Sequence, residues 1–146
     1  MSETADLLDG IARLLDAAGV AQYRPDSPYR AGDIPVTFKS MPANPDRAVT
    51  LSAYGDSDHP TIPLGQRRLQ VRVRGVAEDS LDADAIADAV FGVLHGLTHQ
   101  QFGSVHAIQI RRISTIPLGL DDLQRDERSD NYAIDVNTPE TPLRNG

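Results

Sequence analysis

Cysteine and tryptophan are absent from this chain of 146 residues, and aromatic residues make up only 5% of it. Without cysteine the chain can form neither a disulfide nor a metal site with thiolate ligands. Hydrophobic residues account for 40% of the sequence, so the core must be built mainly from aliphatic side chains. The length fits one domain, because typical domains contain about 100–150 residues.

Long apolar runs and excess positive charge are also missing. No segment approaches the roughly 20 apolar residues that a membrane-spanning helix needs, and the polar, acidic start MSETADLLDG is unlike a secretory signal. We therefore expect synthesis in the cytoplasm of the expressing cell and no membrane partner. The net charge of −7 argues against tight binding of nucleic acid through a broad basic face.

The clearest pattern in the sequence covers residues 64–97. From Arg68 to Arg74 polar and apolar residues alternate strictly, which predicts a half-buried strand that ends at Gly75. Residues 81–97 then carry apolar side chains at helical spacing. The unit contains no nucleophile, metal-ligand cluster or phosphate-binding loop, which favours an assembly protein over an enzyme.

The remaining elements follow from the same periodicities. An N-terminal helix with one apolar stripe is predicted, which Ser2 or Thr4 can cap and Gly19 can end. Strands are predicted at Val20–Tyr23, Val36–Lys39, Ala48–Tyr54, Val105–Ile113 and Tyr132–Val136, and loops at residues 41–47, 55–66 and 117–131. The predicted fold is α+β: a single, mainly antiparallel β-sheet with two amphipathic helices packed on it. This domain covers residues 1–138, and residues 139–146 are expected to be a flexible tail.

Candidate chemistry is sparse. Asp56–His59 places two carboxylates and an imidazole in one turn, but four consecutive loop residues rarely form a dedicated metal site. His95 and His99 have the spacing of a helical zinc pair, yet the glutamate of a metalloprotease is missing and His99 lies where the helix should be ending. We expect no metal, no cofactor and no catalytic residue, and therefore no enzyme.

Arg72 and Arg74 are predicted to share one face of their strand. On the open face of the sheet they can pair with acidic residues of a neighbouring subunit. A strand face that only meets solvent fits the same pattern, and so does a small contact with nucleic acid.

Four blocks of the sequence resemble the tail-terminator or minor capsid proteins of long-tailed bacteriophages. In chain order they are DLLDGIARLLDAAGV; MPANPDRAVTLSAYGD; QVRVRG with the following VFGVLHGL; and IPLGLD with the later NYAIDV. The similarity spans roughly residues 5–137. It implies a ring of six copies at the head-proximal end of the tail, which stops polymerisation of the tail tube and joins the head. It further implies a virion protein assembled in the bacterial host cytoplasm, with the tube protein and a head-completion or neck protein as partners. DNA would pass through the lumen without specific binding.

A closed ring needs two different, complementary patches on each subunit. By the sign of their charge, Arg72 and Arg74 on one side and Asp82, Asp84 and Asp88 on the other are the predicted subunit-interface residues. Three other interpretations stay open at this stage. The first is a head-completion or neck connector, which shares the size, acidity and ring habit. The second is a small enzyme or ligand-binding α+β domain, and the third is a cellular regulatory domain that shares the predicted layers.

Overall fold

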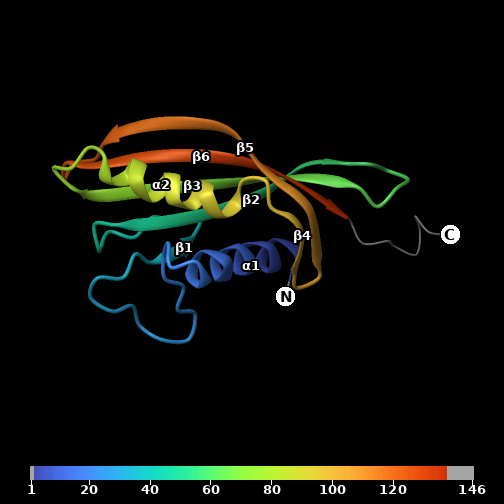
Figure 1. The fold of residues 1–146 in the computed structure, drawn as a ribbon, viewed down its shortest axis with the longest axis horizontal. Helices are drawn as coiled ribbons and strands as arrows, with labels where there is room; N and C mark the ends of the chain where they lie inside the picture. Colours follow the sequence, from blue (N-terminus) through green and yellow to red (C-terminus); the bar gives the residue numbers. More distant parts are fainter. Residues whose placement is uncertain (1, 138–146) are drawn as a thin grey trace.

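The computed structural model describes residues 2–137 and shows two helices packed on one six-stranded sheet (Figure 1). The helices are α1 (Glu3–Ala17) and α2 (Asp82–Leu94), and the strands are β1 (Val36–Phe38), β2 (Ala48–Asp58), β3 (Gly65–Ala77), β4 (Thr98–Phe102), β5 (Val105–Leu120) and β6 (Arg125–Asn137). The strand order is β1-β2-β3-β6-β5-β4, and every neighbouring pair except the parallel β1–β2 is antiparallel. The predicted α+β class is thus confirmed. The tail predicted at 139–146 lies outside the described residues.

Helix α1 begins and ends as its sequence predicts. The Ser2 hydroxyl accepts a hydrogen bond from the backbone N–H of Ala5 at 3.1 Å, which satisfies one of the free donors of the first turn. Gly19 follows the last turn with φ +73°, a left-handed conformation that glycine adopts without steric cost. These local signals fix both ends of the helix.

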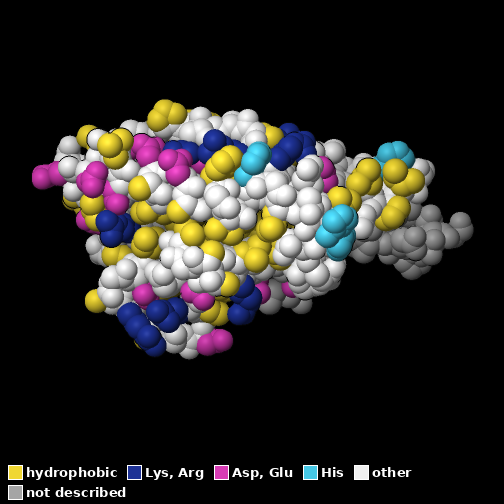
Figure 2. Space-filling model, in the orientation of Figure 1, with side chains coloured by type: hydrophobic (Ala, Val, Ile, Leu, Met, Phe, Trp, Pro, Cys, Tyr) yellow, Lys and Arg dark blue, Asp and Glu magenta, His cyan; other side chains and the backbone are white. Residues whose placement is uncertain are grey.

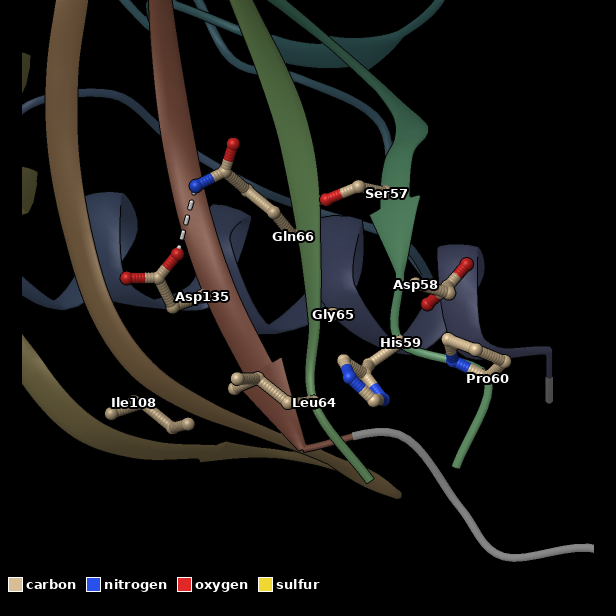
Figure 3. Close-up of a pocket in the computed structure, with 9 residues that line it drawn as sticks. All are labelled: Ser57, Asp58, His59, Pro60, Leu64, Gly65, Gln66, Ile108 and Asp135. Atoms are coloured by element: carbon tan, nitrogen blue, oxygen red, sulfur yellow. Dashed lines mark hydrogen bonds between the residues drawn. The ribbon is translucent and has the colours of Figure 1, made fainter. Parts of the chain in front are cut away.

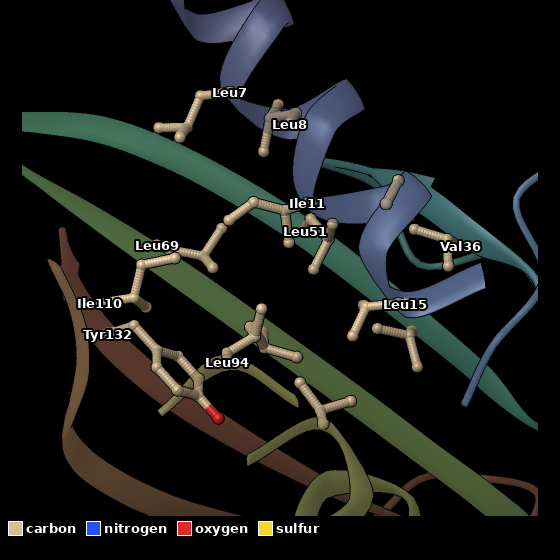
Figure 4. Close-up of a cluster of buried hydrophobic side chains, with 14 of the residues drawn as sticks. Leu7, Leu8, Ile11, Leu15, Val36, Leu51, Leu69, Leu94, Ile110 and Tyr132 are labelled. Carbon is tan, nitrogen blue, oxygen red and sulfur yellow. The ribbon is translucent and has the colours of Figure 1, made fainter. Parts of the chain in front are cut away.

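The core lies between the helices and one face of the sheet (Figure 4). Leu69, Val71 and Val73 of β3 are fully buried, so the strict alternation seen in the sequence is the alternation between core and outer face. Helix α1 contributes Leu7, Leu8, Ile11, Ala12 and Leu15 to the core, and α2 contributes Ala83, Ile86, Ala87, Val90 and Leu94. The only buried aromatic side chains in residues 2–137 are Phe102 and Tyr132, as the composition requires.

Two predicted loops are wrong, because both segments form long hairpins. Strands β2 and β3 are joined by residues 59–64 alone, and β5 and β6 by residues 121–124. Pro117 lies within β5 beyond the reach of β4, which pairs only as far as Gln109, and an edge strand tolerates the missing N–H of proline. The hairpins project from opposite ends of the sheet (Figure 1), since Gly65 pairs with Val136 while Leu120 pairs with Asp126.

Several helix and strand boundaries also differ from the sequence prediction. Strand β3 continues past Gly75, where an added Cβ would lie 2.6 Å from the backbone nitrogen of Ala83. Glycine there permits close approach of α2 and does not end the strand. Helix α2 ends at Leu94, three residues early, and β4, which was not predicted, follows. The predicted strand Val20–Tyr23 is reduced to one bridge between Gln22 and Pro35.

Two helical glycines are expected to respond oppositely to alanine. A Cβ on Gly10 of α1 would lie 2.3–2.7 Å from Phe102 side-chain atoms, whereas nothing lies within 4 Å of one on Gly92 of α2. We expect Gly10→Ala to lower the free energy of unfolding by about 1–3 kcal/mol through overpacking. Gly92→Ala should raise it by about 0.5–1 kcal/mol, because alanine is the better helix former. Urea unfolding measures both, and shifts of the same sign would contradict the packing described here.

Candidate assembly surfaces

The two predicted interface arginines already have partners within the chain. Arg74 is only 3% exposed, and its guanidinium donates to the backbone carbonyls of Asp46 and Pro45, each at 2.7 Å. Arg72 pairs with Glu127 at 2.7 Å. The loop at residues 41–47 therefore lies over part of the outer face of the sheet and holds Arg74 there.

The three predicted interface aspartates lie on α2, on the other side of the sheet. Asp82 pairs with Arg47 through two hydrogen bonds of 2.8 and 3.0 Å and also accepts from the backbone of Val76. The pairing with Arg47 lowers the pKa of Asp82. Asp84 and Asp88 each accept from the Nη1 atom of Arg128 at 3.1 Å. The structure does not bring the arginines and aspartates together within one chain, and their contact between copies stays a prediction.

A surface that the sequence analysis missed lies along β5. On the side of β5 away from β6, the N–H of Ile110 donates to the carbonyl of Leu97, and the N–H of Arg112 donates to Nδ1 of His95. Beyond them, residues 113–120 have no strand on this side in the described chain. We call residues 113–120 the β5 open edge. Exposed large apolar side chains line this edge and the adjoining turn, each between 43% and 61% exposed: Ile113, Ile116, Leu118, Leu120 and Leu123.

The signal for this surface was present in the sequence. Ile116, Leu118 and Leu120 alternate with Pro117 and Gly119, which is the period of a strand. The proline and glycine suggested a loop instead. Apolar side chains are visible at this end of the molecule in Figure 2, beside the carboxylates of α2 and the turn.

The turn that ends the β5–β6 hairpin is firmly held. The carboxylate of Asp121 accepts from the backbone N–H groups of Leu123 and Arg125, both at 2.9 Å, and from the Arg125 guanidinium at 2.8 Å. Arg125 also donates to the carbonyl of Ala43 at 2.8 Å. The N–H of Glu78 donates to the carbonyl of Gln124. The exposed apolar residues are therefore presented on a braced hairpin.

Asp121 gives this hairpin a predictable pH dependence. The backbone N–H of Arg125 and then its side chain hold the pKa of Asp121 below its ordinary value of 3.8. A lowered pKa means that the ionised carboxylate stabilises the fold above pH 3.8, and that this stabilisation is lost as the pH falls through the folded-state pKa. We expect Asp121→Asn to shift the urea midpoint downward near pH 7, with the difference from wild type shrinking below about pH 4.

Asp122 supplies the matched control for that measurement, because its carboxylate makes no hydrogen bond with the described residues. Asp122→Asn should leave the urea midpoint nearly unchanged at every pH. A pH-independent effect of Asp121→Asn would contradict the assigned role of the carboxylate.

At the opposite end, the β2–β3 hairpin borders an open hollow of about 530 Å³. The hairpin forms most of its wall, with Ile108 of β5 and Asp135 of β6 completing it (Figure 3). Gln66 donates to Asp135 at 2.9 Å, and Arg67 joins Glu3 of α1 to Asp58 of the hairpin at 2.6 and 2.8 Å. These pairs fix the root of the hairpin, while Ile62 and Leu64 near its tip are exposed.

The geometry thus describes a small α+β protein in which most of the exposed large apolar side chains lie on two projecting hairpins, an arrangement suited to protein–protein contact. Residues 14–138 match the family described as bacteriophage tail terminator protein. The chain belongs to this family, as the four sequence blocks indicated, and its role is structural, in the phage tail. No curated protein sequence matches the chain.

Two solved structures share the fold. One is described as the virion of a native gene transfer agent particle: the TM-score is 0.64 at 16% sequence identity, covering 94% of this chain and 99% of the other. The second carries no functional name, with a TM-score of 0.55 at 14% identity, covering 94% of both chains. At these identities the likeness shows the fold alone. No helix in the described part of the chain is long and apolar enough to cross a membrane.

Proposed function

We propose that this protein is a tail terminator that assembles head to tail into a ring of about six copies at the head-proximal end of the tail tube. The ring stops polymerisation of the tube and offers the surface to which the head is joined. Its partners are further copies of itself, the tube protein and a head-completion or neck protein. Assembly takes place in the bacterial host cytoplasm.

The β5 open edge is the observation that carries this proposal. An unpaired strand lined by apolar side chains is a template for pairing with another chain, and proteins that stay monomeric protect such edges. Here the edge bears apolar residues and no charged side chain, and Pro117 is its one residue without a backbone N–H. Covering it in an assembly removes both the unpaired backbone groups and the apolar surface from water.

A second unpaired edge supports a head-to-tail assembly. Strand β1 pairs with β2 only over Val49–Leu51, so the rest of β2, through the β2–β3 hairpin, has no strand on its outer side within residues 2–137. This edge and the β5 open edge lie at opposite sides of the sheet and carry different residues. Contact between two different patches is heterologous, and it forms a ring when the rotation between neighbouring subunits closes on itself.

The net charge of −7 suits both the free subunit and the assembled ring. Like charge keeps free subunits apart in solution until specific contacts form. In the finished ring, acidic side chains around the lumen would not retain the phosphates of passing DNA.

Light scattering combined with tube binding tests the proposal. We expect a discrete species of about six times the monomer mass of 15.8 kDa, either free or released from tubes after pelleting. The amount of this protein that pellets with the tubes should be proportional to the number of tube ends, and so should rise when the tubes are sheared. A closed two-fold dimer, or binding proportional to total tube length, would contradict the proposal.

A further inference from the structure

Two histidines on the edge of the sheet face one another through their ring nitrogens. Nδ1 of His99 on β4 lies 3.4 Å from Nε2 of His106 on β5, and the ring centroids are 5.6 Å apart. Gln101 lies two residues after His99 and directly opposite His106 in the antiparallel register. The three side chains therefore share one face of the β4–β5 pair.

Neighbouring hydrogen bonds assign the protons of His106. The Gln101 amide nitrogen donates to the carbonyl of Gly103 at 2.9 Å, which directs its amide oxygen toward Nδ1 of His106, 3.2 Å away. An amide oxygen only accepts, so Nδ1 of His106 carries the proton. The Nε2 atom of His106 then presents a lone pair toward His99.

The spacing of the two facing nitrogens matches a metal chelate. Zinc binds imidazole nitrogen at about 2.0–2.1 Å in tetrahedral geometry, which places two ligand nitrogens roughly 3.3–3.4 Å apart. A ligating histidine typically donates its other N–H to an oxygen that fixes the ring, and the Gln101 oxygen occupies that place for His106. His99 also has φ +51°, which is uncommon for a residue other than glycine.

We propose that His99 and His106 bind a zinc-like divalent transition-metal ion, with Gln101 as the positioning residue for His106. No group of three or more His, Cys, Asp or Glu residues that could hold a metal occurs in the described chain, so solvent completes the coordination. The bound ion joins the short edge strand β4 to β5. The sequence predicts no metal, and of its rejected pair His95 and His99 only His99 faces another imidazole in the structure, because Nδ1 of His95 accepts the backbone N–H of Arg112 at 3.0 Å.

Calorimetric titration of the untagged protein with Zn²⁺ alone tests this site. We expect saturable binding of one ion per chain, weakened at least tenfold in His99→Ala and in His106→Ala, and about tenfold in Gln101→Ala. His59→Ala, which removes an exposed histidine from the β2–β3 hairpin tip, is the matched control and should bind as wild type.

A measurement on the unmodified chain guards against misfolded variants. Zn²⁺ should shift the imidazole nitrogen resonances of His99 and His106 in the wild-type NMR spectrum and leave those of His95 unchanged. Binding that survives both histidine substitutions, absence of saturation at millimolar Zn²⁺, or shifts spread over all histidines would each overturn the proposal.

Discussion

Replacing Arg128 by alanine is expected to lower the free energy of unfolding by about 3–5 kcal/mol. Arg128 lies on the helix-facing side of β6, with a side chain only 10% exposed, and pairs with Asp130, which is 1% exposed, at 2.9 Å. It also holds Asp84 and Asp88 of α2. These carboxylates, Asp130 first, raise the pKa of the guanidinium. Its removal leaves a buried carboxylate with only the 3.5 Å contact to Arg112.

Urea unfolding measures this loss, and Arg13→Ala is the control. Arg13 makes an ion pair of similar length with Asp9 at 2.9 Å, but its side chain is 63% exposed, and exposed pairs contribute little to stability. The double variant Arg128→Ala, Asp130→Ala should recover part of the loss, because no unpaired buried charge remains. Equal effects of the Arg128 and Arg13 substitutions would contradict the buried role of Arg128.

The double variant Leu118→Glu, Leu120→Glu is expected to fold normally but to lose ring assembly. Both leucines are about half exposed, so covering each by a neighbour contributes about 1 kcal/mol, and a buried carboxylate without a partner opposes association further. Each subunit contact should weaken at least about 100-fold. Light scattering then shows monomers at concentrations where the wild type assembles.

Ala85→Glu, Ala89→Glu is the matched control for that variant. It adds the same two charges at exposed positions of α2 that are neither predicted interface residues nor part of residues 113–120. The control should assemble like the wild type while the β5 variant does not. If both variants assemble normally, the β5 open edge is not a subunit contact.

The core could be predicted because its signals are local. Alternation in β3 and the apolar stripe of α1 each depend on residues a few positions apart, and the caps Ser2 and Gly19 are adjacent to the helix they bound. The family could be predicted as well, because the order of these local blocks along the chain is itself informative.

The hairpins could not be predicted in the same way. Their strands are stabilised by cross-strand charge pairs, such as Arg68 with Asp56 at 3.0 Å, so apolar alternation is weak. In β6 the residues Arg125–Asp130 resemble a charged loop, although Arg125, Arg128 and Asp130 are all at least nine-tenths buried. Ion pairing between distant segments permits that burial, and nothing in the local spacing reveals it.

The internal partners of the predicted interface residues could not be predicted either, because they lie far away in the sequence. Arg74 is bound by carbonyls 28 and 29 residues away, and Asp88 by an arginine 40 residues away. Charge sign alone cannot separate a residue that awaits a partner subunit from one that already has a partner in its own chain. The proposed assembly therefore rests on the apolar residues of the β5 open edge, because apolar surface in water has no such internal partner.

Electron microscopy of tail tubes polymerised with and without this protein tests the central claim most directly. We expect tubes grown from purified tube protein to lengthen without limit alone, and to stop growing when the wild-type chain is added, with a ring visible at one end of each tube. The Leu118→Glu, Leu120→Glu variant should leave tube growth unrestrained. Tubes that continue to lengthen with the wild-type chain present, or that carry it along their sides, would contradict the assignment of tube termination to this ring.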